Sequence, residues 1–429
     1  MRSASTRVPK GLPAILQKNP DDVVITFAKR TAVGRAKKGQ LKDTPVDEML
    51  HALLLATFEQ TKLDPSKIDD ICVGTCHPPS PLYVSRAAAL AAGIPHTVPI
   101  STVNRLCSSG LMAIRNIAHA IQSGETSLGL AIGVESMSLK CVLFASTYPP
   151  SAPSNLPRSN FTSVLVRLRE VSQVVSQDVE AHDCVQPMGW TSEMVAETYK
   201  VPREKQDEYA LVSHTRANEA KAAGTFAEEI VPINIRGTTI SIDDTIRPGV
   251  SKESLAGLKP VFPDWGSSTT TAGNASGVGD GAAVCILTTR ERAEREGMQI
   301  LGKWVASSVV GVAPKYMGIS PIYAIPKLLE SVGLTKEDVD VYEINEAFAS
   351  QFAYCVEELK VPLEKINPNG GAIAISHPLG MTGTRQVVTG LAELRRKNKD
   401  VLLTSMCVGS GMGAAGLFVN EVKRATGKL

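Results

Sequence analysis

The sequence predicts an α/β protein made of two similar halves with a different region between them. Patterns typical of buried strands alternate with patterns typical of amphipathic helices, which indicates helices packed on mostly buried sheets. Similar stretches recur near both ends of the chain in the same order, about 270 residues apart. A chain of 429 residues is long enough for two or three domains with a large core.

The first predicted elements are a strand and a helix. Residues 23–28 (VVITFA) are apolar enough for a buried strand, and residues 71–73 predict a second one. Between them, Thr44 is expected to cap a helix, with Pro45 in the first position and Asp47 near the positive end. The apolar residues that predict the core face of this helix are Val46, Leu50, Leu53, Leu54 and Phe58.

An internal repeat links the two ends of the chain. Aligning KIDDICVGT on Ile68 with DVDVYEINE on Val339 gives an offset of 271 residues. Helix starts at Cys107 and His377 lie 270 residues apart, and LGLAIGVES and LLTSMCVGS lie 273 apart. Because the offsets agree in order and spacing, we predict two copies of one α/β unit. Equivalent helix starts of the two copies are then expected to meet at one site.

The region between the repeats has a different character. Residues 191–196, 203–223 and 226–230 are polar and expected to be helical or loop-like, and residues 267–281 form a loop of small residues. Residues 141–177 are rich in proline and serine and follow neither a helix period nor a strand period. One hypothesis is that this atypical insertion includes translated non-coding sequence, which the sequence of the mature transcript would decide.

The composition argues against several classes of function. The chain has 45 basic and 43 acidic residues, so there is no electrostatic reason to expect nucleic acid as a partner. Eight cysteines are too few for a disulfide scaffold, and no second pair at zinc spacing follows Cys72 and Cys76, so no metal is expected. The uncharged run 401–420 is interrupted by glycines, which favours a buried strand–loop–strand over a membrane span.

The motif VNRLCSSG, at 103–110, predicts a reactive thiol. Apolar residues recur at helical spacing after Ser108, so Cys107 is expected at a helix N-terminus. Free N–H groups and the helix dipole at such a position favour the thiolate, which is the nucleophilic form. A buried structural cysteine is the alternative on local grounds.

The motif NPNGGAIAISHPLGMTGTR, at 367–385, predicts a general base. Its glycines permit tight turns, and His377 lies among them just before a helix led by Pro378. A histidine in such a turn can accept a proton at neutral pH. A hydrogen-bonded structural histidine is the alternative.

Two further motifs add candidate groups. SMCVGSGMGAAG, at 405–416, contains the spacing of a dinucleotide fingerprint, but too few residues follow for the rest of that unit. Its glycines are better suited to expose N–H groups to an oxyanion, and Cys407 is a second thiol. In EINEAFA, Asn345 can orient a water or a carbonyl, or else cap the next helix. The remaining cysteines, including Cys72 and Cys76, are expected to pack in the core.

Together these motifs resemble the thiolase family, in the family's order, from about residue 23 to 422 except for 141–177. Segments 181–196 and 270–283 are most similar to the degradative 3-ketoacyl-CoA thiolases of peroxisomes. The resemblance implies a five-layer α-β-α-β-α arrangement of duplicated halves with an inserted loop domain that binds coenzyme A. The implied boundaries are 1–138 for the N-terminal half, completed by 279–300; 139–278 for the loop domain; and 301–429 for the C-terminal half.

The resemblance also implies chemical roles. Cys107 attacks the ketone of a 3-ketoacyl-CoA and forms an acyl thioester while His377 takes its proton. Cys407 protonates the departing acetyl-CoA carbanion and deprotonates the incoming coenzyme A. His377 and a water on Asn345 stabilise the enolate oxygen, and the N–H groups of Cys107 and Gly409 hold the thioester oxyanion.

The family's binding residues and setting are implied in the same way. Ser276 corresponds to the pantetheine contact and Met188 to a substrate-loop element. Coenzyme A is a co-substrate, and no permanently bound cofactor is expected. The protein is expected to be a homodimer or a dimer of dimers in the peroxisome, with the mitochondrion or cytosol as alternatives. A biosynthetic acetoacetyl-CoA thiolase and a catalytically impaired acyl-CoA-binding protein remain alternative functions.

One residue at the predicted site departs from the family pattern. Ser376 stands before His377, where the family has glycine. If this position needs a positive φ angle, the serine strains the turn that carries the histidine; otherwise the change is harmless.

Overall fold

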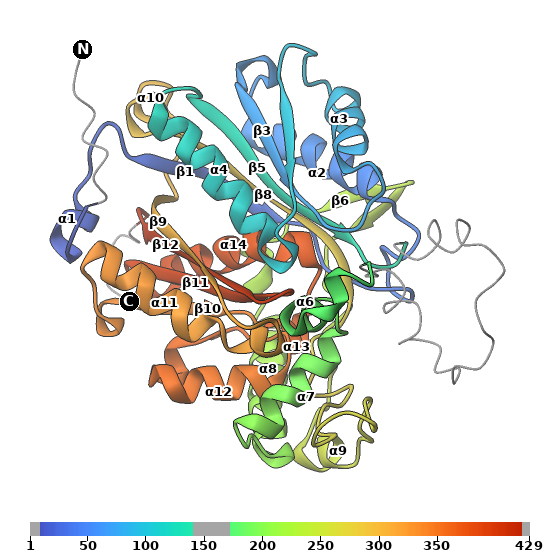
Figure 1. The fold of residues 1–429 in the computed structure, drawn as a ribbon. Coiled ribbons are helices and arrows are strands. Elements are labelled where there is room, and N and C mark those ends of the chain that lie inside the picture. The colour runs from blue at the N-terminus through green and yellow to red at the C-terminus, as the bar shows by residue number, and fades with distance from the viewer. Residues whose placement is uncertain (1–8, 140–171, 423–429) are drawn as a thin grey trace.

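The structure, a computed structural model, describes residues 9–139 and 172–422 (Figure 1). Most of the atypical insertion 141–177 therefore lies outside the described residues. Ten strands form one mixed sheet in the order β10-β11-β12-β9-β1-β8-β5-β3-β4, with β2 beside β8. They are β1 (Val23–Arg30), β2 (Gly34–Arg35), β3 (Asp70–Gly74), β4 (Ile100–Val103), β5 (Leu128–Ser136), β8 (Gly279–Thr289), β9 (Gly302–Gly311), β10 (Val341–Ile344), β11 (Val401–Val408) and β12 (Met412–Asn420).

The sheet confirms the predicted duplication. In the first half, β1, β8 and β5 pair antiparallel and β5 pairs parallel with β3. In the second half, β9, β12 and β11 pair antiparallel and β11 pairs parallel with β10. The two halves meet at a short antiparallel pairing of β1 with β9, where Val24 faces Lys303 and Ile25 faces Gly302.

Helices complete five layers. In the middle, α4 and α14 pack on each other and on strands of both halves, while α2 and α3 cover the outer face of the first half and α11 and α12 that of the second (Figure 1). This is the predicted α-β-α-β-α arrangement. The bounds of these helices are α2 (Val46–Thr61), α3 (Pro81–Ala91), α4 (Ser109–Ser123), α11 (Pro321–Val332), α12 (Ala349–Leu359) and α14 (Leu379–Lys397); the short helices α1 (Leu12–Leu16), α10 (Arg290–Arg295) and α13 (Ala372–Ile375) lie at the edges of the layers or in turns.

The inserted region is largely helical and returns to the first half through β8. It contains α6 (Val179–Cys184), α7 (Met188–Thr198), α8 (Arg203–Ala222), α9 (Lys252–Ala256) and the hairpin of β6 (Ile233–Ile235) and β7 (Thr238–Ile240). The expected small-residue loop 267–281 ends earlier, because Gly279 already begins β8 and pairs with β2. The domain boundaries at 139, 279 and 301 stay a prediction.

Local expectations fared differently in two places. Residues 401–420 form two buried strands joined by a tight turn, as predicted, and no helix among the described residues is long and apolar enough to cross a membrane. The expected cap of α2 was wrong. Pro45, in an extended conformation, is the N-cap residue, and the helix begins at Val46. No side chain of the described residues, that of Thr44 included, accepts a hydrogen bond from the first turn of this helix.

Candidate active site

The site lies where the N-terminal ends of α4 and α14 meet, as the repeat predicted. A Cβ on Gly110 of α4 would lie 2.6 Å from the carbonyl oxygen of Gly380 in α14, and a Cβ on Gly380 would lie 2.5 Å from the carbonyl oxygen of Val134. Both distances are shorter than van der Waals contact, so only glycine permits this approach. Cys107 and His377, which precede these two helices, are thereby brought to one place.

Cys107 lies in a 3-10 turn, η2 (Leu106–Ser108), directly before α4. Its side chain is 9% exposed and packs in a cluster with Met406 and Val408. Side-chain hydrogen bonds hold the turn: the Arg105 N–H donates to Ser109 Oγ at 2.9 Å, and the Leu106 N–H donates to an Asn104 side chain at 2.9 Å. The thiol therefore has a fixed place at a helix start, where free N–H groups and the helix dipole point toward it.

The hydrogen bonds of His377 define which ring nitrogen is unprotonated. The Thr382 hydroxyl donates to the Pro378 carbonyl at 2.8 Å, so its oxygen accepts the N–H of His377 Nδ1 at 2.6 Å. The Asn345 amide donates to Nε2 at 3.3 Å. Burial, with a smaller contribution from Arg385, lowers the pKa of His377 to about 3. The neutral ring thus presents Nε2 as a proton acceptor.

Asn345 and Cys407 complete the polar part of the site. The Asn345 N–H donates to the Ser405 carbonyl at 2.9 Å, while its Oδ1 is buried without a hydrogen-bond partner among the described residues. The Cys407 thiol donates to Gln351 Oε1 at 3.3 Å. Burial, together with Cys107 and Cys355 nearby, raises the pKa of Cys407 well above its usual value. Cys407 is therefore a protonated thiol at neutral pH and can give up a proton.

Gly409 and Met188 lie next to each other, between the Cys107 turn and Cys407. Gly409 follows β11 in the tight turn, and a Cβ there would lie 3.0 Å from Leu106 and 3.4 Å from the Met188 sulfur. Met188 begins α7 and packs beside Cys407 in a small apolar cluster. The structure thus brings both predicted residues to the site.

Ser276 lies at the edge of the site on the loop before β8. Its N–H donates to the Ala347 carbonyl at 3.0 Å, and the next carbonyl, of Gly277, accepts the His377 N–H at 2.8 Å. The serine is half-buried. The loop therefore ties the predicted coenzyme A contact directly to the histidine turn.

Ser376 has the conformation that would favour glycine. Its φ is 82° and its ψ is 169°, a region that L side chains rarely adopt. Its side chain packs on the same loop, since a Cβ on Gly277 would lie 2.4 Å from Ser376 Oγ and one on Gly279 would lie 3.0 Å from Ser376 Cβ. The turn that carries His377 is therefore strained by its own serine.

Sequence reasoning missed several neighbours of the site. Gln351 accepts a hydrogen bond from the Cys407 thiol and Thr382 accepts one from His377, so these two side chains hold the thiol and the imidazole in place. Cys76, expected only to pack in the core, donates its thiol to the Leu106 carbonyl at 3.2 Å beside Cys107. Its carboxylate neighbour Glu135 was also missed, although a lone charge in the apolar run LGLAIGVES stands out.

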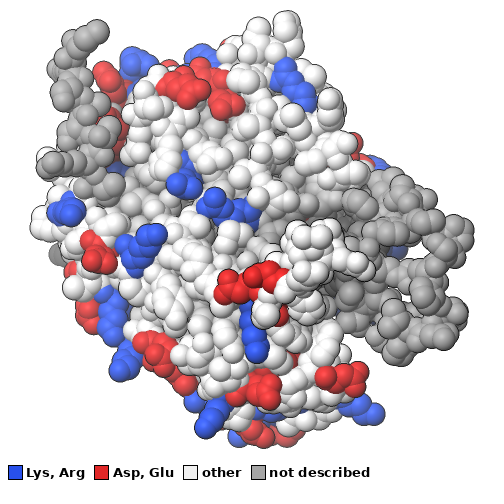
Figure 2. Space-filling view, viewed as in Figure 1, with Lys and Arg blue, Asp and Glu red and all other residues white. Residues whose placement is uncertain are grey.

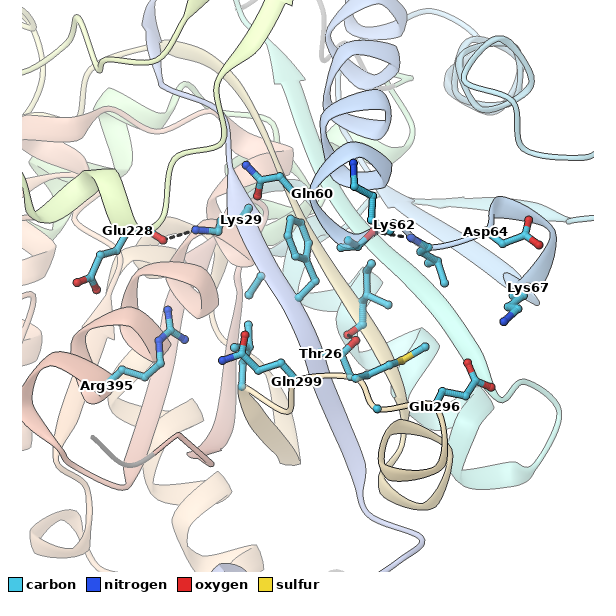
Figure 3. Close-up of a pocket in the computed structure, with 18 residues that line it drawn as sticks. Thr26, Lys29, Gln60, Lys62, Asp64, Lys67, Glu228, Glu296, Gln299 and Arg395 are labelled. Atoms are coloured by element: carbon cyan, nitrogen blue, oxygen red, sulfur yellow. Dashed lines mark hydrogen bonds between the residues drawn. The ribbon is translucent and has the colours of Figure 1, made fainter. Parts of the chain in front are cut away.

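An open cavity elsewhere among the described residues has a different lining. An open cavity of about 800 Å³ lies between β1, the end of α2 and the loop 296–301 (Figure 3). Among the described residues that line it, none is a cysteine, a histidine or a predicted site residue. Figure 2 shows acidic and basic side chains interspersed over one face. Within residues 9–139 and 172–422, no group of three or more potential ligands could hold a metal ion.

Comparison with known proteins identifies the family. The family models described as thiolase N-terminal domain and thiolase C-terminal domain match residues 23–291 and 298–420. The chain is 47% identical over 414 residues to the peroxisomal 3-ketoacyl-CoA thiolase B of Mus musculus, an alignment that covers 94% of this chain and 92% of that protein.

Solved structures agree. The crystal structure of the dimeric peroxisomal thiolase of Saccharomyces cerevisiae is 41% identical with a TM-score of 0.85, and the match covers 96% of this chain and 100% of that one. The human mitochondrial 3-ketoacyl-CoA thiolase, solved in complex with CoA, is 33% identical with a TM-score of 0.81 over 94% of this chain and 99% of that one. Both halves of the chain and its fold are accounted for, and the chain belongs to the thiolase family.

Proposed function

We propose that this protein cleaves 3-ketoacyl-CoA with coenzyme A, giving acetyl-CoA and an acyl-CoA shortened by two carbons, in peroxisomal fatty acid β-oxidation. The observation that carries the proposal is the meeting of two thiols, Cys107 and Cys407, with the neutral imidazole of His377 in one buried site. The names of the similar proteins support the same reaction and compartment.

In the first half-reaction, the Cys107 sulfur attacks the ketone carbon and His377 Nε2 takes the thiol proton. The resulting imidazolium lies beside the negative charge that develops on the oxygen of the attacked ketone. This attraction offsets the cost of burying a charged ring, which otherwise keeps the imidazole neutral. The carbon–carbon bond breaks, an acyl thioester remains on Cys107, and the acetyl-CoA carbanion takes the proton of the Cys407 thiol. The high pKa of Cys407 suits this step, because the thiol is protonated when the carbanion forms.

In the second half-reaction, the Cys407 thiolate takes the proton of an incoming coenzyme A. The coenzyme A sulfur attacks the thioester on Cys107, and the shortened acyl-CoA leaves. Cys107 recovers its proton from His377, so both thiols end in their starting state. The cycle has ping-pong form and needs no permanently bound cofactor or metal.

Two groups would stabilise negative oxygen. The Asn345 side chain, with its unpartnered buried oxygen, suits a water that hydrogen-bonds the enolate oxygen beside His377. Backbone N–H groups of Cys107 and Gly409 would hold the thioester oxyanion, since both lie at turns around the thiol.

The inserted region 139–278 would bind coenzyme A, with Ser276 contacting pantetheine and Met188 beside the acyl group. A homodimer is the proposed assembly, as in the yeast structure.

The test of this function is a thiolysis assay on the Cys107→Ala variant. We expect it to release no acetyl-CoA above background from 3-ketoacyl-CoA and coenzyme A, while Cys285→Ala, which removes a buried thiol in β8, keeps the activity. An undiminished rate in Cys107→Ala would end the proposal. Activity confined to the four-carbon substrate would favour a biosynthetic acetoacetyl-CoA thiolase. Coenzyme A binding without acylation of Cys107 would favour an impaired binding protein.

A further inference from the structure

Glu135 is a buried carboxylate at the end of β5 that binds both halves of the site. It accepts the Gly380 N–H at 2.9 Å, the N–H groups of Cys76 and His77 at 3.1 Å each, and the Thr75 hydroxyl at 3.4 Å. The side chain is fully buried, and His77 Nδ1 also lies 3.4 Å from its Oε1. Several N–H donors and a helix N-terminus stabilise a buried negative charge without an ion pair to Lys or Arg.

One arm of these contacts leads to His377. Gly380 lies in the first turn of α14, three residues after the histidine. The same turn supplies the Pro378 carbonyl, which accepts from Thr382, the residue that holds His377 Nδ1. The carboxylate thus fixes the helix start that orients the imidazole.

The other arm leads to Cys107. The Cys76 N–H is held by Glu135, and the Cys76 thiol donates to the Leu106 carbonyl at 3.2 Å and lies 3.5 Å from Ser109 Oγ. Leu106 has a φ of 45°, which an ordinary residue adopts only when its surroundings hold it. The loop 75–77 therefore supports the turn that carries the nucleophile.

We propose that Glu135 is a positioning residue that fixes the Cys107 turn and the His377 turn relative to each other, and this inference rests on the proposed function. A single carboxylate is suited to this task because it accepts hydrogen bonds from both turns at once and donates none. Both arms meet on one oxygen, Oε2, which accepts from Gly380 and Cys76, while Oε1 accepts from His77 and Thr75. A glutamine with its amide oxygen at the Oε2 position would keep both arms, whereas a methionine of similar length removes both acceptors.

The experiment compares Glu135→Met, which removes both acceptor oxygens at similar side-chain length, with wild-type protein. We expect kcat for thiolysis to fall on the order of 100-fold, as for a displacement of about 1 Å between reacting groups, with KM for coenzyme A unchanged. The rate at which iodoacetamide alkylates Cys107, followed by mass spectrometry across pH, should fall as well. Asp340→Asn is the matched control: Asp340 accepts two backbone N–H groups at 3.0 Å at the far end of β11, and its loss should leave both readouts unchanged.

A second pair of variants tests the Cys107 arm without touching the buried charge. Cys76→Ala should slow alkylation of Cys107 and thiolysis together, and Cys76→Ser, which keeps a donor to Leu106, should restore both. A folded Glu135→Met protein with kcat and alkylation within twofold of wild type, or a Cys76→Ala protein that matches wild type, would overturn the proposal. If the wild-type protein lacks thiolysis, the proposed function fails, and the alkylation rates still decide whether Glu135 positions Cys107.

Discussion

At the scale of single residues, the burial of His377 has a consequence for stability. Its pKa is about 3 in the folded protein against an ordinary 6.5, because burial and then Arg385 disfavour the charged ring. Between these pH values the unfolded chain binds a proton that the folded chain does not. The free energy of unfolding therefore falls as the pH drops from 6.5 to 3, by up to about 1.4 kcal/mol per pH unit from this residue.

Denaturant unfolding of wild-type protein and the His377→Gln variant across this pH range measures the effect. We expect the variant to lose this part of the pH dependence, with a flatter decline toward acid. His214, which is also buried with a lowered pKa, is present in both proteins, so it does not contribute to the difference between their pH dependences. Identical slopes would show that the pKa of His377 is not lowered as described.

Ser376 gives a second prediction. Its positive φ angle belongs to a region that strains a serine by about 1–3 kcal/mol, and part of any relief is offset by the greater freedom of glycine in the unfolded chain. We expect Ser376→Gly to raise the free energy of unfolding by about 1 kcal/mol, measured by denaturant titration. Ser376→Ala keeps the Cβ and hence the strain, so it should give no such gain. Equal effects of both variants would contradict the strain argument.

The candidate site shows what single residues reveal in a sequence. Cys107, His377 and Cys407 could be expected at one site because each stands at a helix start or a glycine-rich turn with polar neighbours. Gln351 and Glu135 could not, because their importance depends on contacts between elements far apart in the chain. Glu135, for example, joins residues 75–77 to residue 380 only after the halves have packed.

At the scale of elements, the crossing of α4 and α14 depends on glycine. A methyl group on Gly110 would lie 2.6 Å from both the Gly380 carbonyl and the Thr384 hydroxyl. Gly110→Ala is therefore expected to destabilise the protein by about 1–3 kcal/mol and to push the two helix starts apart, lowering thiolysis as well. In Gly311, at the end of β9, a Cβ would meet no atom within 4 Å.

Gly311→Ala is accordingly the control for this experiment, and it should change neither the unfolding midpoint nor the activity beyond measurement error. Thermal unfolding and the thiolysis rate are measured on both variants. A Gly110→Ala protein as stable as the Gly311→Ala protein would show that the helices have room that their contacts do not suggest.

Most elements could be predicted because periodicity is local. The strand at 23–28 and the paired strands at 401–420 follow from runs of apolar residues, and the helix after Cys107 follows from its apolar stripe. The predicted start of α2 was too early, and the predicted end of the loop 267–281 was too late. In both cases the boundary depends on the surrounding fold. The start of α2 depends on the extended backbone at Pro45, and the end of the loop depends on β2, which pairs with Gly279.

At the scale of the whole molecule, Arg30 fastens the inserted region to the first half. It lies in β1, and its guanidinium pairs with Glu229 at 2.6 Å and with Asp243 at 2.8 Å, all three side chains being buried. Arg30→Met leaves two buried carboxylates without their cation. We expect a loss of about 3–5 kcal/mol in the free energy of unfolding and faster proteolysis within the inserted region.

The comparison for this prediction is Arg236→Met. Arg236 pairs with Glu48 at 2.7 Å, but its side chain is 61% exposed, so its loss should change the free energy of unfolding far less than the loss of Arg30. Denaturant unfolding and limited proteolysis with mass spectrometry are run on both variants. Equal destabilisation would mean that the buried pairing of Arg30 does not hold the inserted region in place.

The duplicated halves lead to a final consequence. Cys107 and His377 precede equivalent central helices, so the proposed nucleophile and the proposed base occupy corresponding places in the two halves. A symmetric pair of identical chains would have to place the same residue at both positions. Two copies joined in one polypeptide are free of that constraint, because each copy can carry its own residue at the corresponding place. The asymmetry of the proposed chemistry is thus a division of labour between two halves of the same architecture.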